Sequence, residues 1–241
     1  MKLNIFTSTT KDGIMSKDKI FFPTMGAEER SLLYENTLNR FFTKINIDYR
    51  KVIFLSDKNN NTLSRIVTRK TKKVKEGIVI LKSTTPNLLV AVETRDDPII
   101  VASLNLKDNE NVSAIALGTI ENINNNIIHE IIESLIKETG AAPFEMTFYI
   151  GACPSKGNYI LKNISQLTNN YLWKGAIEKK DKIYYLDLRL AIFNQLISEI
   201  VDPNYIYFDQ NDTTTNSNYF SKFSNKDGKN LVCVVYTNEE V

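Results

Sequence analysis

Hydrophobic positions along the chain recur with two periods, one typical of strands and the other of helices. Short runs that are apolar throughout, or that alternate apolar and polar residues, are bounded by turn residues such as Gly13, residues 59–61 and Pro86. These runs predict strands within residues 2–9, 51–56, 65–70, 77–83, 88–93, 99–106, 112–118, 144–152, 205–209 and 230–237.

Three longer segments carry apolar residues at the spacing of one helix face. The first, 27–45, has acidic residues in its first turn, where they stabilise a helix dipole. The second, 125–140, ends at Gly140, and the third, within 183–201, is terminated by Pro203. The apolar face of the third helix is expected to carry Leu188, Ala191, Ile192, Leu196 and Ile200.

Strands outnumber helices, yet long helices alternate with them along the chain. The run 112–118 leads directly into the second helix, which predicts a strand-to-helix crossover. The pattern therefore indicates a mixed α/β (α+β) fold in which helices cover the outer faces of mixed β-sheets. No repeat or low-complexity linker interrupts the chain, so residues 1–241 are expected to form a single domain.

Charge is nearly balanced, with 30 Lys and Arg against 28 Asp and Glu, a net charge of +2. Such a balance does not favour nucleic acid or an anionic membrane as the main partner. The densest basic run, RIVTRKTKKVK at 65–75, is typical of a solvated connector between two strands. We therefore expect neither nucleic acid nor a membrane as the principal partner.

The two cysteines, Cys153 and Cys233, are too few for a disulfide framework. The sequence has no N-terminal apolar segment and no run of about eighteen apolar residues. These features predict a soluble, cytoplasmic protein, expected as a monomer or a weak homodimer.

The only histidine, His129, lies in the second predicted helix. The motif HEIIE offers one His and two Glu, whereas zinc sites use two or more His or Cys ligands. We expect a helix-surface imidazole paired with a nearby carboxylate. Cys233, within LVCVV, is expected in the core, while Cys153, in the loop GACPSKG, is either a partly buried thiol or a ligand contact.

Several stretches in order carry a resemblance to one known family. YYLDLRLAIFNQL and YFSKFSNKDGKNLVCVVYT resemble its closing F-L-D-L and F-F-S-Y-R-R patterns, and FYIGACPSKGNYIL resembles its I-G-P-x-I-G segment. LLVAVETRDDPIIVAS and VSAIALGTIENI resemble L-A-V-x-T-A-D-C-x-P-V and H-A-G-W-R-G-T, while FTSTTKDGIMS and LNRFF resemble elements near its start. The family is the laccase-domain family, also called multicopper polyphenol oxidase-like proteins and described as purine nucleoside phosphorylases. The resemblance covers nearly the whole chain and implies that family's fold.

The family's metal ligands are replaced in this sequence. In the family, a His after an early strand, the Cys of A-D-C and the His of H-A-G-W-R-G bind a metal, usually zinc. The Cys position falls on Asp96, or on Asp97 if the register slips by one, while the histidines fall near Lys58 and on Ser113. Zinc prefers nitrogen and sulfur ligands, and a lysine ammonium repels it. The resemblance therefore implies that Lys58, Asp96 and Ser113 line the family's cavity. With these residues, we expect the cavity to hold no metal cofactor.

The family's arginines are replaced as well. Thr10, Phe223 and Ser224 stand where the family has arginines that would clamp a phosphate. Lys222 and Lys229 lie close by in the sequence and supply positive charge, although lysine holds a phosphate less directionally than arginine.

A compensating ion pair between Lys58 and Asp96 is one hypothesis for how the cavity is held together without metal. Removing one partner of a buried pair costs about 3 to 5 kcal/mol. The alternative is two exposed loop charges.

Three interpretations remain open at this level. A member that has lost its metal chemistry would bind a nucleoside, phosphate or another small anion, with Asp97, Cys153, Lys222 and Lys229 as candidate contacts. A plain interaction protein would bind a protein partner. The alternative is a purine nucleoside phosphorylase or adenosine deaminase-type enzyme that uses Asp96, Asp97 and Lys58 as acid–base groups, so the sequence leaves open whether the chain is an enzyme.

Overall fold

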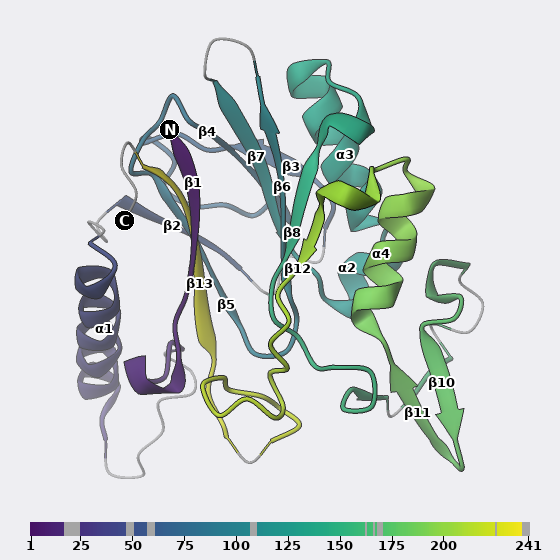
Figure 1. The fold of residues 1–241 in the computed structure, drawn as a ribbon. Coiled ribbons are helices and arrows are strands. Elements are labelled where there is room, and N and C mark those ends of the chain that lie inside the picture. Colours follow the sequence, from purple (N-terminus) through teal and green to yellow (C-terminus); the bar gives the residue numbers. More distant parts are fainter. Residues whose placement is uncertain are drawn as a thin grey trace.

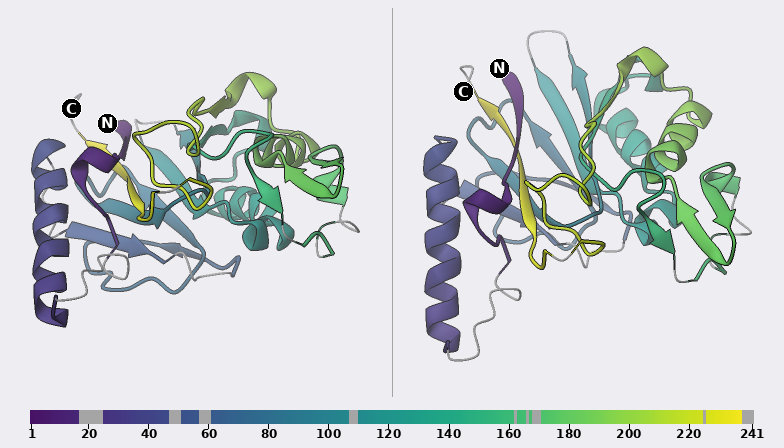
Figure 2. Two further views of the ribbon diagram at one scale, coloured as in Figure 1. Left: turned by 90° about the horizontal axis from the view of Figure 1, so that it is seen from below. Right: turned by 60° about the horizontal axis from the view of Figure 1, so that its bottom comes forward.

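Two large β-sheets pack face to face, and helices cover the outer face of each sheet (Figure 1). This computed structural model describes residues 1–16, 25–46, 51–56, 61–106, 110–161, 163–165, 167, 171–224 and 226–237. Figure 2 shows the resulting order of layers, with one long helix on one side and the remaining helices on the other. The predicted α+β fold with helices on the outer faces is confirmed.

The smaller of the two packed sheets joins the two ends of the chain. Its four strands lie in the order β1 (Lys2–Thr7), β13 (Asn230–Thr237), β5 (Leu89–Thr94) and β2 (Val52–Leu55). β13 runs antiparallel to both β1 and β5, whereas β2 runs parallel to β5. All eight residues of β13 are buried, as expected for a central strand covered on both faces.

The larger sheet has six strands and two edges. Their order is β12 (Ile206–Phe208), β8 (Thr147–Ile150), β6 (Ile99–Asn105), β7 (Asn111–Leu117), β4 (Ile78–Lys82) and β3 (Ser64–Ile66). The central pairs are antiparallel, and each edge strand runs parallel to its neighbour.

Alternation along the strands divides the core into layers, because successive side chains of a strand point to opposite faces. Val90 and Val92 of β5 point between the sheets, where they meet residues of the six-stranded sheet such as Val101 and Ile115. The intervening Ala91 belongs to the outer layer instead. The apolar residues of β5 therefore pack into two clusters, one on each face of the sheet.

The helix α1 (Ala27–Lys44) covers the outer face of the four-stranded sheet. Its Leu38, Phe41 and Phe42 pack in one buried cluster with Ala91 and Cys233. Cys233 is fully buried, so the prediction that it is a core residue is confirmed.

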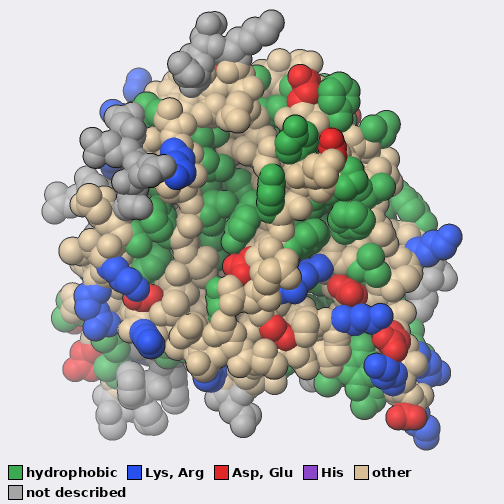
Figure 3. Space-filling view, in the orientation of Figure 1, with side chains coloured by type: hydrophobic (Ala, Val, Ile, Leu, Met, Phe, Trp, Pro, Cys, Tyr) green, Lys and Arg blue, Asp and Glu red, His purple; other side chains and the backbone are tan. Residues whose placement is uncertain are grey.

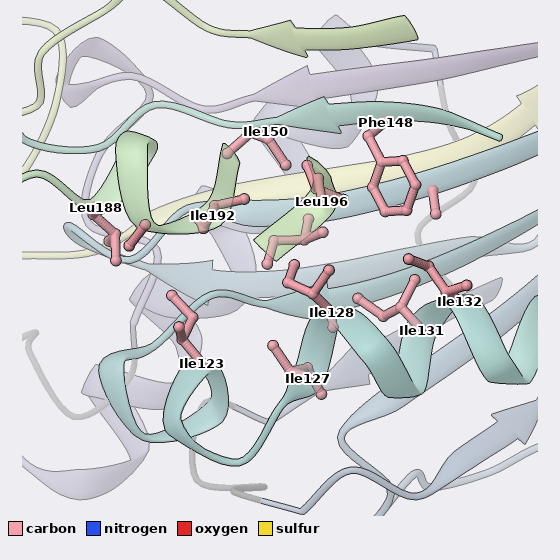
Figure 4. Close-up of a cluster of buried hydrophobic side chains, with 14 of the residues drawn as sticks. Ile123, Ile127, Ile128, Ile131, Ile132, Phe148, Ile150, Leu188, Ile192 and Leu196 are labelled. Carbon is pink, nitrogen blue, oxygen red and sulfur yellow. The ribbon is translucent and has the colours of Figure 1, made fainter. Parts of the chain in front are cut away.

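Three helices cover the outer face of the six-stranded sheet: α2 (Ile120–Asn124), α3 (Ile127–Thr139) and α4 (Leu188–Ser198). Figure 4 shows isoleucines of α3, among them Ile128 and Ile131, lying against Leu196 of α4 and Phe148 of β8. α3 ends at Gly140, which adopts the left-handed conformation at φ +72°, as predicted.

A peripheral sheet and four short 3-10 helices complete the described chain. The sheet pairs β11 (Ile183–Leu186) with β10 (Ile177–Lys180) and with β9 (Ile160–Leu161). The short helices are η1 (Thr10–Asp12), η5 (Pro143–Glu145), η6 (Tyr171–Trp173) and η7 (Pro203–Tyr205). No helix in the described part of the chain has the length and apolar character needed to span a bilayer.

The structure corrects the third predicted helix at its C-terminal end. It starts where Asp187 accepts a hydrogen bond from the Leu190 amide, and it ends at Ser198. Ile200 then adopts a left-handed conformation at φ +64° and is 73% exposed. The expectation that Ile200 lies on the apolar face is therefore wrong, because the helix has already turned.

Candidate functional site

The buried carboxylate of Asp96 is the centre of the candidate site. It lies in the polar loop TRDDP between β5 and β6, and its side chain is only 1% exposed. One carboxylate oxygen accepts a hydrogen bond from the Thr213 hydroxyl at 2.8 Å, and the other accepts one from the Lys222 amide at 2.7 Å. Both oxygens therefore hold loops together.

Lys222 sits beside Asp96 with its ammonium group over two aromatic rings. Its Nζ donates to the Tyr159 hydroxyl at 3.0 Å and lies 4.6 Å from the Tyr159 ring centroid and 5.0 Å from that of Phe223. Burial, together with the charges of Asp97 and Asp96, raises the pKa of Tyr159. Tyr159 is thus a hydrogen-bond partner that stays protonated at neutral pH.

The loop that follows β8 is fastened to the loop that follows β12. Asp212 accepts hydrogen bonds from the Ser155 hydroxyl at 2.5 Å and from the Asn158 side-chain amide at 2.7 Å. Burial raises the pKa of Asp212, but hydrogen bonds from Ser155, Thr214 and Asn158 outweigh it and hold that pKa well below its usual range. This carboxylate is ionised and structural.

Cys153 lies in the hydrophobic core rather than on a ligand surface. Its side chain is fully buried, and burial raises the pKa of the thiol to about 12. A buried thiol of this kind is inert as a nucleophile or metal ligand. The backbone carbonyl of Cys153 accepts a hydrogen bond from Arg189 Nη2 at 3.4 Å.

Ser113 lies away from Asp96, and the ion-pair partner of Lys229 is Glu93. Ser113 is fully buried in the middle of β7, four residues before the strand end at Leu117, or roughly 13 Å along the strand. Its hydroxyl is hydrogen-bonded to that of Tyr236 at 2.6 Å. Lys229 faces the α1 side, where its Nζ lies 3.6 Å from Glu93.

Lys58 lies outside the described residues. The proposed pairing of Lys58 with Asp96 therefore stays a hypothesis, while Thr213 and Lys222 are the partners that the structure shows for Asp96. Asp97 lies next to Asp96, and its backbone carbonyl accepts a hydrogen bond from Thr94.

His129 stands apart from this site on the surface of α3. Its Nδ1 lies 3.2 Å from Glu199, a residue at the end of α4. The hydrogen bond with Glu199 raises the pKa of His129. The prediction of a surface imidazole paired with a carboxylate is confirmed.

A narrow cleft lies close to Asp96, because its lining includes the neighbouring Arg95 and Thr213, the hydrogen-bond partner of Asp96. Its lining residues come from several separate segments of the chain, among them Thr94, Gly151, Thr213 and Asn230, and its volume is about 10 Å³. That volume holds roughly one water molecule, whereas ligand pockets usually measure roughly 300 Å³ or more. The described residues therefore leave no room for a nucleoside there.

Metal binding is not supported by the donors around the cleft. Within the described ranges, no three His, Cys, Asp or Glu residues are grouped so that they could hold a metal ion. Copper and zinc sites are built mainly from imidazole and thiolate. The single imidazole is bonded to Glu199, and both thiols are buried.

Sequence patterns missed several residues that build this region. Thr213, Tyr159 and Arg189 had no recognisable motif, because their roles depend on partners far along the chain. Asp212 had a usable signal: an Asp followed by Thr in a polar run is typical of an Asx-turn, which its bond from the Thr214 amide forms.

Comparison with known proteins gives one family and one fold. Residues 28–237 match a family model described as multi-copper polyphenol oxidoreductase laccase. The search of curated proteins finds no match. Among solved structures, the hypothetical protein YfiH of Bacillus licheniformis has a TM-score of 0.72 at 16% identity, with 92% of this chain and 86% of that chain covered.

Two further solved structures show the same fold. YlmD from Geobacillus stearothermophilus has a TM-score of 0.70 at 14% identity, covering 85% of this chain and 80% of that chain. The Neisseria meningitidis protein NMB0706 has a TM-score of 0.67 at 14% identity, covering 93% and 86% respectively. At such identities the likeness shows the fold alone.

Proposed function

The chain belongs to the multi-copper polyphenol oxidoreductase laccase family, and from that premise we propose that it is a divergent, non-catalytic member that acts by binding. The observation that carries the proposal is the state of Asp96. This carboxylate stands where the resemblance puts a metal ligand, and both its oxygens accept hydrogen bonds from within the chain. Each carboxylate oxygen could accept a further bond, but a side chain that is only 1% exposed presents neither oxygen to a substrate or metal from solution.

The surroundings of Asp96 support the same proposal. A cleft of about 10 Å³ admits no nucleoside. The residues that would have to assist a metal do not fit one, because Cys153 is buried with a raised thiol pKa and His129 belongs to a different surface. The two buried, free cysteines also support a reducing, cytoplasmic setting as part of the proposal.

A small anion is the ligand that Lys222 favours. The residue is exposed, and its ammonium is positioned over Tyr159 and Phe223, so that phosphate would meet a positive charge and a nucleoside base would meet aromatic rings. A contact at this surface does not require the closed cleft to open.

Turnover assays test the non-catalytic assignment. Adenosine, inosine and methylthioadenosine are each incubated with the protein and phosphate, with and without added zinc or copper, and free base is measured by chromatography. A commercial purine nucleoside phosphorylase serves as the positive control. We expect no release above the blank without protein, and any reproducible release contradicts the proposal.

A matched pair of variants identifies the group responsible if release occurs. Asp96→Asn would abolish it if Asp96 is the acid–base group, whereas Asp227→Asn, which changes an exposed carboxylate, would not. Circular dichroism of both variants separates lost chemistry from lost folding.

The small-anion contact is tested by thermal shift with inorganic phosphate and with adenosine. We expect a rise in melting temperature that is lost in Lys222→Ala and kept in Lys182→Ala, an exposed lysine in the β10–β11 hairpin. If neither compound changes the melting temperature, neither binds at Lys222. The proposed ligand is then a protein partner instead of a small anion.

A further inference from the structure

The six-stranded sheet has an edge at β3. The β3 strand pairs with β4 alone among the described strands. The Ile78 amide donates to the Leu63 carbonyl and the Val67 amide donates to the Ile80 carbonyl, so the backbone groups of the odd-numbered residues within 63–67 face β4. Because the amide groups of a strand alternate between its two sides, those of Ser64 and Ile66 face outward. Ile66 is 42% exposed.

The opposite edge of the same sheet is β12. The β12 strand pairs with β8 alone among the described strands, and the Asp209 amide donates to Ile150. The same alternation turns the Ile206 carbonyl and the Phe208 amide to the outer side. The side chain of Tyr207 is 53% exposed on this strand. In Figure 1, β12 lies nearer the viewer and β3, at the other edge of the same sheet, lies farther away.

The two edges carry opposite charge. The β3 edge, defined here as residues 63–76, contains six Lys or Arg residues and one acidic residue, Glu76. The β12 edge, defined as residues 199–209, contains three acidic residues and no Lys or Arg. Opposite charge at two separate surfaces of one molecule favours contact between copies of it.

Both edges also expose apolar surface that a partner would bury. Leu63 and Ile66 are exposed on the β3 edge, and Ile200, Tyr205 and Tyr207 are exposed on the β12 edge. Figure 3 shows hydrophobic and acidic side chains together at the upper right of this face, where Figure 1 places the upper ends of α3 and α4. An edge strand presents unpaired backbone groups with which another chain can pair, and here the charges that would keep like edges apart attract the opposite edge.

We propose that a second copy of this chain docks its β3 edge against the β12 edge, so that copies associate head to tail through the six-stranded sheet. Lysines of one copy then face the carboxylates and tyrosine rings of the next. The contact joins two different surfaces, so each copy keeps one unused edge. Association therefore continues beyond two copies, unlike that of a symmetric dimer. Neither edge includes Asp96 or Lys222, so the inference stands apart from the proposed function.

Each edge can be blocked without disturbing its own sheet. Ile66→Pro removes an outward amide from β3 but leaves the hydrogen bonds to β4, which use the neighbouring residues. Tyr205→Lys with Tyr207→Lys places positive charge at two exposed positions of the β12 edge. Circular dichroism confirms that each variant folds.

Mixing the two blocked proteins gives the decisive measurement, by analytical ultracentrifugation at low salt. The wild-type mass is expected to rise with concentration above the 27.5 kDa of one chain, and the rise is expected to be suppressed by salt. Each blocked protein alone should stay monomeric. An equimolar mixture should form a complex of two chains and no larger one, because one intact edge of each kind remains.

Charge reversal on a solvated loop provides a variant with no risk to folding. Lys72→Glu with Lys73→Glu should weaken self-association about tenfold. The matched control, Lys179→Glu with Lys182→Glu, makes the same change in net charge on the exposed β10–β11 hairpin and should leave association unchanged.

Three results would overturn the head-to-tail contact. The first is a wild-type chain that stays monomeric up to the solubility limit. The second is a blocked variant that still dimerises by itself. The third is a control, Lys179→Glu with Lys182→Glu, that weakens association as much as Lys72→Glu with Lys73→Glu does. A monomeric chain whose β3 edge binds a single-stranded oligonucleotide would assign that edge to nucleic acid instead.

Discussion

The carboxylate of Asp96 joins segments that are 117 and 126 residues away in the sequence, through Thr213 and Lys222. A buried, hydrogen-bonded carboxylate of this kind costs more to disrupt than an exposed one, because its partners would be left unsatisfied. His129 likewise has a partner within the chain, because its imidazole is hydrogen-bonded to Glu199. At the scale of residues, the groups most suited to chemistry have structural partners.

The His129–Glu199 pair predicts a pH dependence of stability. Its contact raises the pKa of His129 in the folded state above the reference value of 6.5. The pair therefore contributes its full stabilisation at pH values below the pKa that His129 has in the unfolded chain. That stabilisation is lost as the pH rises through the higher pKa that His129 has in the folded protein. Because both side chains are partly exposed, we expect only a few tenths of a kcal/mol.

The measurement compares melting temperatures of the wild type and Glu199→Gln. The difference should favour the wild type at about pH 5.5 and shrink toward zero at about pH 8.5. Glu130→Gln, which removes only a longer-range charge effect on His129, serves as the control. A difference that grows with pH would contradict the assignment.

At the scale of elements, helix ends show how local rules are kept or broken. α3 ends on Gly140, which adopts the left-handed conformation without steric cost. α4 ends with Ile200 in the same conformation, and the Val201 amide donates to the Leu196 carbonyl across the turn. A β-branched residue there is strained.

Ile200→Gly is therefore expected to stabilise the protein. Relief of the strain in the left-handed conformation lowers the free energy of the folded state by about 1 to 2 kcal/mol. The greater freedom of glycine in the unfolded chain offsets part of this, so the free energy of unfolding should rise by about 1 kcal/mol. Urea unfolding gives the free energy. Ile197→Gly, one turn earlier inside α4, should instead destabilise by about 1 kcal/mol. Equal signs for the two changes would refute the strain argument.

At the scale of the whole molecule, a buried polar contact crosses the interface between the two large sheets. The Ser113 hydroxyl of β7 and the Tyr236 hydroxyl of β13 lie 2.6 Å apart in an otherwise apolar layer. Burial raises the pKa of Tyr236 to about 12, so its hydroxyl is protonated. Each hydroxyl satisfies the other, which fixes how the sheets are aligned.

A double-mutant cycle tests this contact. Tyr236→Phe and Ser113→Ala each leave one buried hydroxyl unsatisfied, so each should cost about 1 to 3 kcal/mol. The double variant should cost less than the sum of the single variants by about 1 kcal/mol, because no orphaned group remains. Tyr207→Phe, at an exposed tyrosine, should be neutral in the same urea unfolding experiment. Additive costs would show that the hydroxyls do not interact.

Periodicity alone predicted the layers of this protein. The apolar runs of β5 and β13, the helix ending at Gly140 and the burial of Cys233 all follow from residues a few positions apart. Such features depend on burying one face of one element, and that requirement is written locally in the sequence. The family resemblance likewise rested on motifs in order along the chain, and the matched family model agrees with it.

The tertiary structure alone decided which side chains meet. Alignment placed Ser113 in the same cavity as Asp96, but the register of β7 turns Ser113 toward Tyr236. The basic run at 65–75 became half of a charged pair of sheet edges only once β3 and β12 were placed at opposite ends of one sheet. Such contacts depend on strand order, register and loop paths, which no local pattern specifies, because the partners lie tens to hundreds of residues apart in the chain.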